Sequence, residues 1–271
     1  MLVGPRVAFV HVPKCAGEFV SAWMASAGLG ETRNESPWKH AALSDVPALD
    51  GLRVVSTWRN PWAWHRSWYH YTAGVGGEPP LGFHRVLAEV VGDDFEGVCA
   101  AALRPALAVR RSFRTAWPNA GGPSLPLVEV TERLGIGLYS YFLLRSVVRD
   151  PLSLLSATRD DIRMRLAETT GVDAIVASER VSTGLPRALR LLGVDVSDEA
   201  EAALLSAEPV NVATAFGPRS YRGRTGSAFP PDLDRLVRER EWLPIEVLGY
   251  AGPDAPPARS AWLRPGTLAG G

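Results

Sequence analysis

The sequence predicts an α/β fold in which a central parallel β-sheet is flanked by helices on both faces. Residues 7–12 (VAFVHV) form a mostly apolar, β-branched run, as in a strand that is covered on both sides. A short loop and a segment with helical spacing of apolar residues follow this run directly. The same order of strand, loop and helix recurs over residues 52–71. Because consecutive units of this kind place their strands in parallel, we expect a parallel sheet with helices packed against it.

Size and composition indicate a single soluble domain. The chain has 271 residues, of which 46% are hydrophobic and 21% are charged, and this is enough to bury a substantial core. We expect one domain over residues 1–250. Residues 251–271 are rich in Pro, Gly and Ala, so we expect them to form a C-terminal tail outside the core.

Charge and hydropathy disfavour several classes of partner. The 29 basic residues equal the 29 acidic ones, so we expect no nucleic acid bound through an overall positive field. The longest nearly uncharged apolar stretch, residues 134–144, is shorter than the ~18–20 residues needed to cross a bilayer, so we expect no membrane association. The N-terminus does not resemble a secretory signal, and two cysteines are too few for a disulfide framework. A cytoplasmic location is therefore expected.

The first strand–loop–helix unit suggests a site for an anion. Its loop is HVPKCAG, residues 11–17, and its helix is expected to end near residues 28–30. The small Ala16 and Gly17 let the main chain approach a ligand, the helix start presents N–H groups, and Lys14 adds a positive charge. The Walker A pattern GxxxxGK[ST] is absent, which disfavours an NTPase. Taken alone, the motif is equally compatible with an ordinary turn that carries a solvated lysine.

The second unit adds an arginine and a serine. Residues 52–58 predict a strand, and Asn60-Pro61 predicts the start of a helix that continues to Tyr71. Arg59 is therefore expected at the carboxyl end of a strand, where α/β sheets bind ligands, with Ser67 about two turns into the helix. A guanidinium and a hydroxyl in these places suit one phosphate group, while an ion-pairing arginine and a small packing residue are the alternative.

Four tryptophans lie in the same unit: Trp58, Trp62, Trp64 and Trp68. Their helical spacing makes most of them core residues by default. The alternative is that one of them offers a stacking face to adenine or to an aromatic acceptor.

Further elements are expected around these two units. Two Gly/Pro-rich loops, residues 74–80 and 118–126, are expected to border a mostly helical stretch, and loops of this kind often shape binding sites. A third strand is expected over residues 172–177, and further helices over about 184–192 and 231–242.

Together the two units resemble the PAPS-dependent sulfotransferases, which use 3′-phosphoadenosine 5′-phosphosulfate (PAPS) as sulfuryl donor. The HVPKCAG loop resembles the family's 5′-phosphosulfate loop, and RNP at residues 59–61, with a serine eight positions after the arginine, resembles its 3′-phosphate motif. The resemblance is strongest to the group whose animal members sulfate carbohydrates and whose bacterial members are short. It implies a P-loop-like fold. Weaker similarity extends to residues 38–41, 172–193 and 221–250.

The resemblance also implies which residues bind the cofactor: Lys14, Cys15, Ala16, Gly17, Glu18, Arg59, Ser67 and Arg222. The family commonly has Thr or Ser where this chain has Glu18 and Phe19, so main-chain N–H groups must do more of the binding. A carboxylate at Glu18 repels phosphosulfate unless it turns away or holds a proton. Arg222 belongs to a YRGR segment, for which a solvated basic turn is the alternative.

Sulfuryl transfer requires a base for the acceptor hydroxyl and positive charge on the leaving phosphate oxygen. Lys14 is expected to supply the charge. His40 is the candidate base, because an imidazole pKa near ~6.5 suits the task and the resemblance places a histidine in this segment. Three glutamates are rival candidates: Glu18, Glu31 and Glu35.

The sequence as a whole predicts a sulfotransferase with PAPS as co-substrate, no metal, and a small-molecule or carbohydrate acceptor. The neutral net charge disfavours a glycosaminoglycan acceptor. A cluster of arginines over residues 104–114 could still bind one, so this acceptor stays an alternative. A nucleotide-dependent kinase of related fold is one alternative, and the missing Walker Ser/Thr disfavours it. A catalytically inactive protein that binds 3′-phosphoadenosine 5′-phosphate (PAP) is the other, suggested by Glu18 and Phe19.

Overall fold

The computed structural model describes residues 1–32, 43, 49, 51–73, 88, 91–104, 127–168, 170–207 and 229–265. Two residues of the sequence-predicted site, His40 and Arg222, lie outside these ranges, as does the rival base Glu35. The two Gly/Pro-rich loops and most of the arginine cluster lie outside them as well.

The described residues form an α/β structure around a six-stranded sheet of order β3-β1-β2-β4-β5-β6. Its strands are β1 (Leu2–Val3), β2 (Val7–Val10), β3 (Glu31–Thr32), β4 (Arg53–Trp58), β5 (Ala174–Ala177) and β6 (Ala261–Leu263). The central strands β2, β4 and β5 are parallel, whereas β1, β3 and β6 are antiparallel to their neighbours. The expected α/β class is confirmed, but the sheet is mixed rather than parallel. The marginal strands have only two or three residues, which is too short to show a strand pattern in the sequence.

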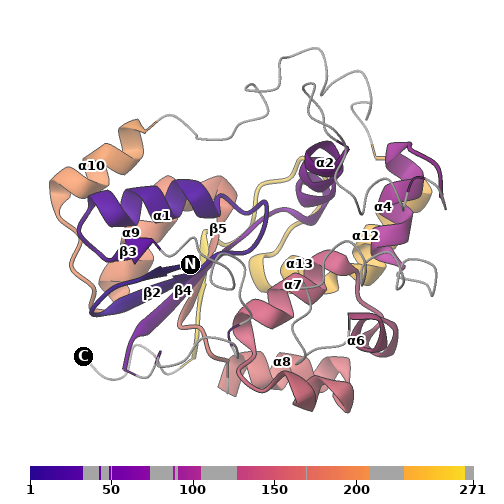
Figure 1. The fold of residues 1–271 in the computed structure, drawn as a ribbon, viewed down its shortest axis with the longest axis horizontal. Helices are drawn as coiled ribbons and strands as arrows, with labels where there is room; N and C mark the ends of the chain where they lie inside the picture. The colour runs from indigo at the N-terminus through magenta and orange to yellow at the C-terminus, as the bar shows by residue number, and fades with distance from the viewer. Residues whose placement is uncertain are drawn as a thin grey trace.

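Helices cover both faces of this sheet (Figure 1). They are α1 (Gly17–Ser26), α2 (Pro61–Thr72), α4 (Phe95–Leu103), α6 (Leu127–Leu134), α7 (Leu138–Val147), α8 (Arg159–Glu168), α9 (Val181–Leu191), α10 (Asp198–Ser206), α12 (Pro231–Arg240) and α13 (Trp242–Leu248), with short 3₁₀ turns η3 (Pro151–Leu155) and η4 (Ser178–Arg180). In Figure 1, α1, α9 and α10 lie on one side of the sheet, and α2, α7 and α13 lie on the other. The expected helix over residues 231–242 corresponds to α12, which ends at Arg240, and a separate helix, α13, begins at Trp242.

Alternate residues of the central strands feed two separate cores. Val7 and Phe9 of β2 pack in the core under α1 and α9, whereas Ala8 and Val10 pack in the core that contains α2 and α7. This alternation explains why the strand is apolar at consecutive positions, since both of its faces are buried. The four tryptophans of the second unit belong to the larger core.

The C-terminal segment differs from the sequence-based expectation, because part of it joins the sheet. Residues 261–263 form β6, and Trp262 pairs with Ile175 of β5 in antiparallel register. Asn60 Nδ2 also donates a hydrogen bond to the carbonyl oxygen of Gly252 at 2.9 Å. The Pro- and Gly-rich composition suggested a tail outside the core, but Trp262 packs against the larger core, and Ala261 and Leu263 pack against the core under α1 and α9.

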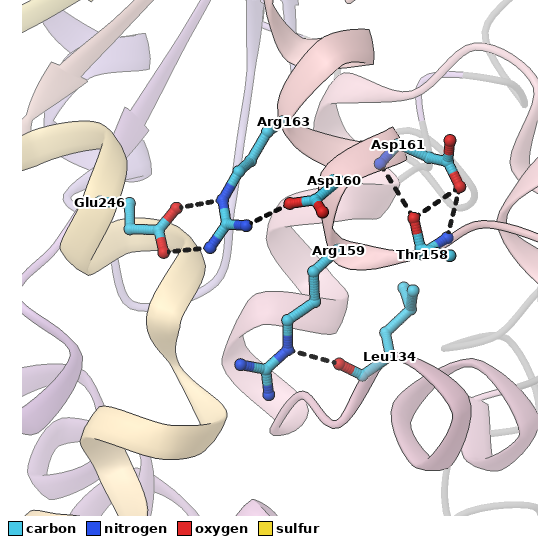
Figure 2. Close-up of polar contacts among 7 residues, drawn as sticks. All are labelled: Leu134, Thr158, Arg159, Asp160, Asp161, Arg163 and Glu246. Atoms are coloured by element: carbon cyan, nitrogen blue, oxygen red, sulfur yellow. Dashed lines mark hydrogen bonds and ion pairs between the residues drawn. The ribbon is translucent and has the colours of Figure 1, made fainter.

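Two arginines of α8 tie this helix to its neighbours (Figure 2). Arg159 Nε donates to the carbonyl oxygen of Leu134, at the end of α6, at 3.2 Å. Arg163 binds both carboxylate oxygens of Glu246 on α13, at 2.7 and 2.8 Å. Both guanidinium groups lie over the ring of Trp242, 5.4 and 5.2 Å from its centroid. Within the described part of the chain, no helix is both long enough and apolar enough to cross a membrane.

Candidate functional site

The loop between β2 and α1 lies at the carboxyl end of the central strands. Lys14 and Ala16 have positive φ angles of 63° and 61°, and Cys15 between them does not. Alternation of this kind turns successive N–H groups toward one side, as in the main-chain nests that bind anions. A non-glycine residue in the left-handed region costs of the order of 1–3 kcal/mol, so the surrounding contacts must hold this conformation.

Side chains of β4, of α2 and of the turn between them bind the carbonyl oxygens of this loop. The carbonyl oxygens of residues 13, 14 and 15 accept hydrogen bonds, in that order, from Trp64 Nε1 (2.8 Å), Arg59 Nη1 (3.2 Å) and Thr57 Oγ1 (2.5 Å). In a trans peptide the next N–H group points opposite to the carbonyl. The N–H groups of Lys14 and Ala16 therefore point away from β4 and α2, while the Cys15 N–H closes the turn on Val12 O at 3.3 Å.

The helix that follows begins without a capping side chain. Ala16 is the N-cap residue of α1 and no side chain accepts a hydrogen bond there, whereas Asn60 caps α2 by accepting from Ala63 N at 3.2 Å. The first N–H groups of a helix lack partners inside the helix and carry partial positive charge. Gly17 is required where α1 starts, because an added Cβ would lie 1.7 Å from Cδ2 of the buried His11 ring.

Two cations lie beside this loop. Burial lowers the pKa of Lys14, and the positive charge of Arg59 lowers it further, while Glu18 acts in the opposite direction. Lys14 Nζ also lies 4.3 Å from the centroid of the Tyr71 ring. Glu18 on the first turn of α1 is exposed to solvent. The repulsion between Lys14 and Arg59 means that a bound anion would stabilise both.

A buried tyrosine of α7 joins the ends of two strands. The hydroxyl of Tyr139 accepts from Arg59 N at 2.6 Å, donates to Arg59 O at 2.9 Å and lies 3.5 Å from Cys15 Sγ. Burial raises the pKa of the Cys15 thiol to about 12. Cys15 is therefore a protonated packing group. Its N–H is bonded to Val12 O and its carbonyl oxygen to Thr57 Oγ1, so its part in the site is to shape the loop.

The end of β5 reaches the same edge of the sheet. Glu179 follows β5, and its carboxylate accepts from Asn60 N at 2.8 Å and from the hydroxyl of Tyr250 at 2.8 Å. Burial and the Glu179 charge raise the pKa of Tyr250, so its hydroxyl stays protonated and donates. The carboxyl ends of all three parallel strands are thus linked by side chains at one place.

The structure brings together most of the described residues that the sequence singled out: Lys14, Cys15, Ala16, Gly17, Glu18 and Arg59. Ser67 is half-buried on α2, one turn before Tyr71, and residues four apart share a helix face. Ser67 therefore lies on the helix face that Lys14 contacts. The rival base Glu31 lies on β3, with β1 between it and β2.

The four tryptophans provide no stacking face for a ligand. Each is at most 2% exposed, so the alternative role considered for them is wrong and the core interpretation is right. Sequence reasoning also gave no part in the site to two residues of other helices and turns, Tyr139 and Glu179. The sequence held a signal for Glu179, because this residue lies two positions after the predicted strand over residues 172–177. Tyr139 lies 80 positions from Arg59 and has no local signal.

The described residues hold no evident metal site, and one cavity among them lies away from the loop. Among the described residues, no group of three or more His, Cys, Asp or Glu side chains is placed to hold a metal ion. A cavity of about 440 Å³ lies beside the segment that precedes β5, and its lining includes Arg149, Ser153 and Arg165. It contains none of the residues that the sequence analysis assigned to the site.

No protein-family model, curated protein or solved structure matches the chain. The site is therefore interpreted from its own residues and from the resemblance of its two motifs. Outward main-chain N–H groups, an uncapped helix start and two neighbouring cations suit a ligand with closely spaced negative charges.

Proposed function

We propose that the chain is a sulfotransferase that transfers the sulfuryl group of PAPS to a hydroxyl of a small-molecule or carbohydrate acceptor. The observation that carries this proposal is the loop of residues 13–17, which contains Lys14. Its carbonyl oxygens at residues 13, 14 and 15 are bonded to Trp64, Arg59 and Thr57. The paired resemblance of HVPKCAG and RNP…S to the family's two cofactor motifs supports PAPS over other anions.

In this proposal the two strand–loop–helix units bind different groups of the cofactor. The main-chain N–H groups of Lys14, Ala16, Gly17 and Glu18 bind the 5′-phosphosulfate, and Arg59 with Ser67 binds the 3′-phosphate. One terminal nitrogen of Arg59 already donates to Lys14 O, and the fork has a second terminal nitrogen for the ligand. The exposed carboxylate of Glu18 supports the same division, because only its N–H is then needed at the phosphosulfate.

The proposed reaction is an in-line displacement at sulfur. The acceptor oxygen forms a bond to sulfur, the bond from sulfur to the 5′-phosphate oxygen breaks, and the hydroxyl proton passes to a base. PAP leaves with added negative charge on its 5′-phosphate, which Lys14 stabilises. His40 remains the candidate base, with the glutamates as rivals.

The proposal is tested by calorimetric and thermal-shift titrations with PAP, beside ATP plus Mg²⁺. A ligand at ~100 times its dissociation constant adds about 2.7 kcal/mol to stability, so selective binding of PAP is readily detected. Transfer is then followed from sulfur-labelled PAPS to a panel of hydroxylated acceptors. Binding of ATP plus Mg²⁺ alone favours the kinase, and the absence of binding by either nucleotide overturns the proposed site. Tight PAP binding without transfer to any acceptor favours the inactive protein.

Arg59→Ala gives the sharpest test of the 3′-phosphate assignment. Loss of a charge-assisted hydrogen bond costs about 1.5–3 kcal/mol, so PAP affinity is expected to fall by about ten- to hundredfold. The matched control is Arg187→Ala, which removes an exposed arginine from α9 and is expected to leave PAP affinity unchanged. Near-normal affinity in Arg59→Ala overturns the assignment.

A further inference from the structure

Tyr71 differs from the tryptophans of α2 in its exposure to solvent. Its side chain is 50% exposed, whereas Trp64 and Trp68 are buried. Lys14 Nζ lies 4.3 Å from the centroid of its ring. This distance is well within the ~6 Å over which an ammonium is attracted to an aromatic face.

Three other charged or titratable groups act on Lys14: Arg59, Glu18 and Cys15. Arg59, in the turn between β4 and α2, opposes the charged form of Lys14, and burial of the ammonium does so more strongly. Glu18 on α1 favours the charged form, and the adjacent Cys15 thiol is buried. An attractive ring face therefore adds to the effect of Glu18 and offsets the repulsion from Arg59.

We propose that Tyr71 is a positioning residue, which holds the Lys14 ammonium charged beside the loop of residues 13–17 and so preserves anion binding as pH rises. The contact between Lys14 and Tyr71 stands on the geometry alone. Only the identity of the ligand, PAP or PAPS, rests on the proposed function.

Direct titration of Lys14 is the first test, and the sequence makes it practicable. The chain has two lysines, Lys14 and Lys39, so ¹³C-dimethylation gives two lysine signals in addition to that of the N-terminus. A Lys39→Arg variant assigns them. A cation–π contact at an exposed site corresponds to roughly 0.4–0.7 pH units, and the pKa of Lys14 is expected to fall by this amount in Tyr71→Leu. Tyr71→Phe restores the ring and is expected to restore the wild-type value.

Calorimetry with PAP at pH 7 and pH 9.5 provides the second test. PAP affinity is expected to fall by a larger factor between pH 7 and pH 9.5 in Tyr71→Leu than in the wild type. Tyr71→Phe is expected to restore the wild-type factor. Tyr71→Gln, a second variant without the ring, separates this effect from a folding defect of the leucine variant. Near-ultraviolet circular dichroism establishes that each variant is folded.

The outcomes distinguish this inference from the proposed function. An unchanged Lys14 pKa in both ringless variants overturns the role of Tyr71. A lowered Lys14 pKa with a wild-type pH dependence of PAP affinity overturns it as well. A lowered Lys14 pKa in a protein that binds no PAP supports the contact and its effect on charge, and overturns the proposed ligand instead.

Discussion

A single methyl group added at Gly17 would collide with the buried ring of His11, at 1.7 Å from Cδ2. The ring or the loop must shift, so Gly17→Ala is expected to destabilise the protein by about 1–3 kcal/mol in urea unfolding and to weaken PAP binding. The control is Gly252→Ala, whose added Cβ meets its nearest atom, Arg238 Nη2, at 3.6 Å. We expect the control to stay within about 0.5 kcal/mol of the wild type. Equal stability of the two variants would contradict the close contact with His11.

Tyr139 sets the position of Arg59 through its hydroxyl. Tyr139→Phe leaves the Arg59 N–H without its acceptor, which is expected to cost about 1–3 kcal/mol of stability and to lower PAP affinity. Tyr69→Phe is the matched control, because it removes a hydroxyl that donates to Asp93 O at 2.9 Å, away from the loop. Unfolding and calorimetry on both variants separate stability from positioning. A wild-type PAP affinity in Tyr139→Phe would show that Arg59 holds its place without the phenol.

The pair His65–Glu241 predicts a pH dependence of stability. His65 Nε2 lies 2.9 Å from Glu241 Oε1, and both side chains are buried. Burial alone lowers the pKa of His65, but its interactions with Cys99 and Glu241 outweigh burial and raise the pKa to about 10. Since the unfolded value is ~6.5, the stabilisation is fully present below pH ~6.5 and is lost as pH rises toward 10.

His65→Gln measures this contribution. We expect the difference in unfolding free energy between the wild type and His65→Gln to shrink steadily from pH 7 to pH 10, because only the wild type loses a buried charge. Titration of groups that do not interact with His65 affects both proteins alike and cancels in the difference. A difference that stays constant over this range would mean that His65 is neutral in the folded protein.

At the scale of elements, the ties between helices differ in what they contribute. Arg163 on α8 binds Glu246 on α13, but its side chain is 47% exposed (Figure 2). Exposed ion pairs contribute little, so Arg163→Gln is expected to cost less than about 1 kcal/mol in urea unfolding. Arg159→Gln is expected to cost more, because its guanidinium donates to carbonyl oxygens of Leu134, Gly135 and Glu239. A larger loss of unfolding free energy in Arg163→Gln than in Arg159→Gln would contradict this prediction.

Residues at the ends of helices predicted where those helices begin or end. The start of α2 follows from Asn60-Pro61, since the asparagine side chain accepts from Ala63 N and the proline fits the first helical position. The same reasoning failed for β6, where composition indicated a solvated tail. Its pairing with β5 depends on a strand far earlier in the chain, which composition does not reveal.

On the scale of the whole molecule, the candidate site and the 440 Å³ cavity lie in different places, and hydrogen exchange distinguishes them. Binding of PAP is expected to slow amide exchange in residues 11–18 and 57–67, at the carboxyl ends of β2 and β4. Exchange in residues 148–170, around the cavity, is expected to stay unchanged. Protection confined to the cavity would move the nucleotide site there.

The sequence by itself determined the α/β class, the two strand–loop–helix units, and the placement of Lys14 and Arg59 at strand ends. These features follow from local patterns, because an apolar run, a capping residue and the next helix all lie within about twenty residues. The sheet then brings the two cations together, since parallel strands place their carboxyl ends at one edge. Predicting that Lys14 and Arg59 lie close together required only the correct pairing of β2 with β4.

Only the tertiary structure decided how the loop is held and which aromatic residue faces it. Tyr139 reaches Arg59 across 80 positions, and the exposure of Tyr71 against the burial of Trp64 and Trp68 depends on how α2 packs. The antiparallel margins and β6 likewise arise from pairing between distant segments. Such contacts leave no period in the sequence, because their energy comes from surfaces that meet only after the chain has folded.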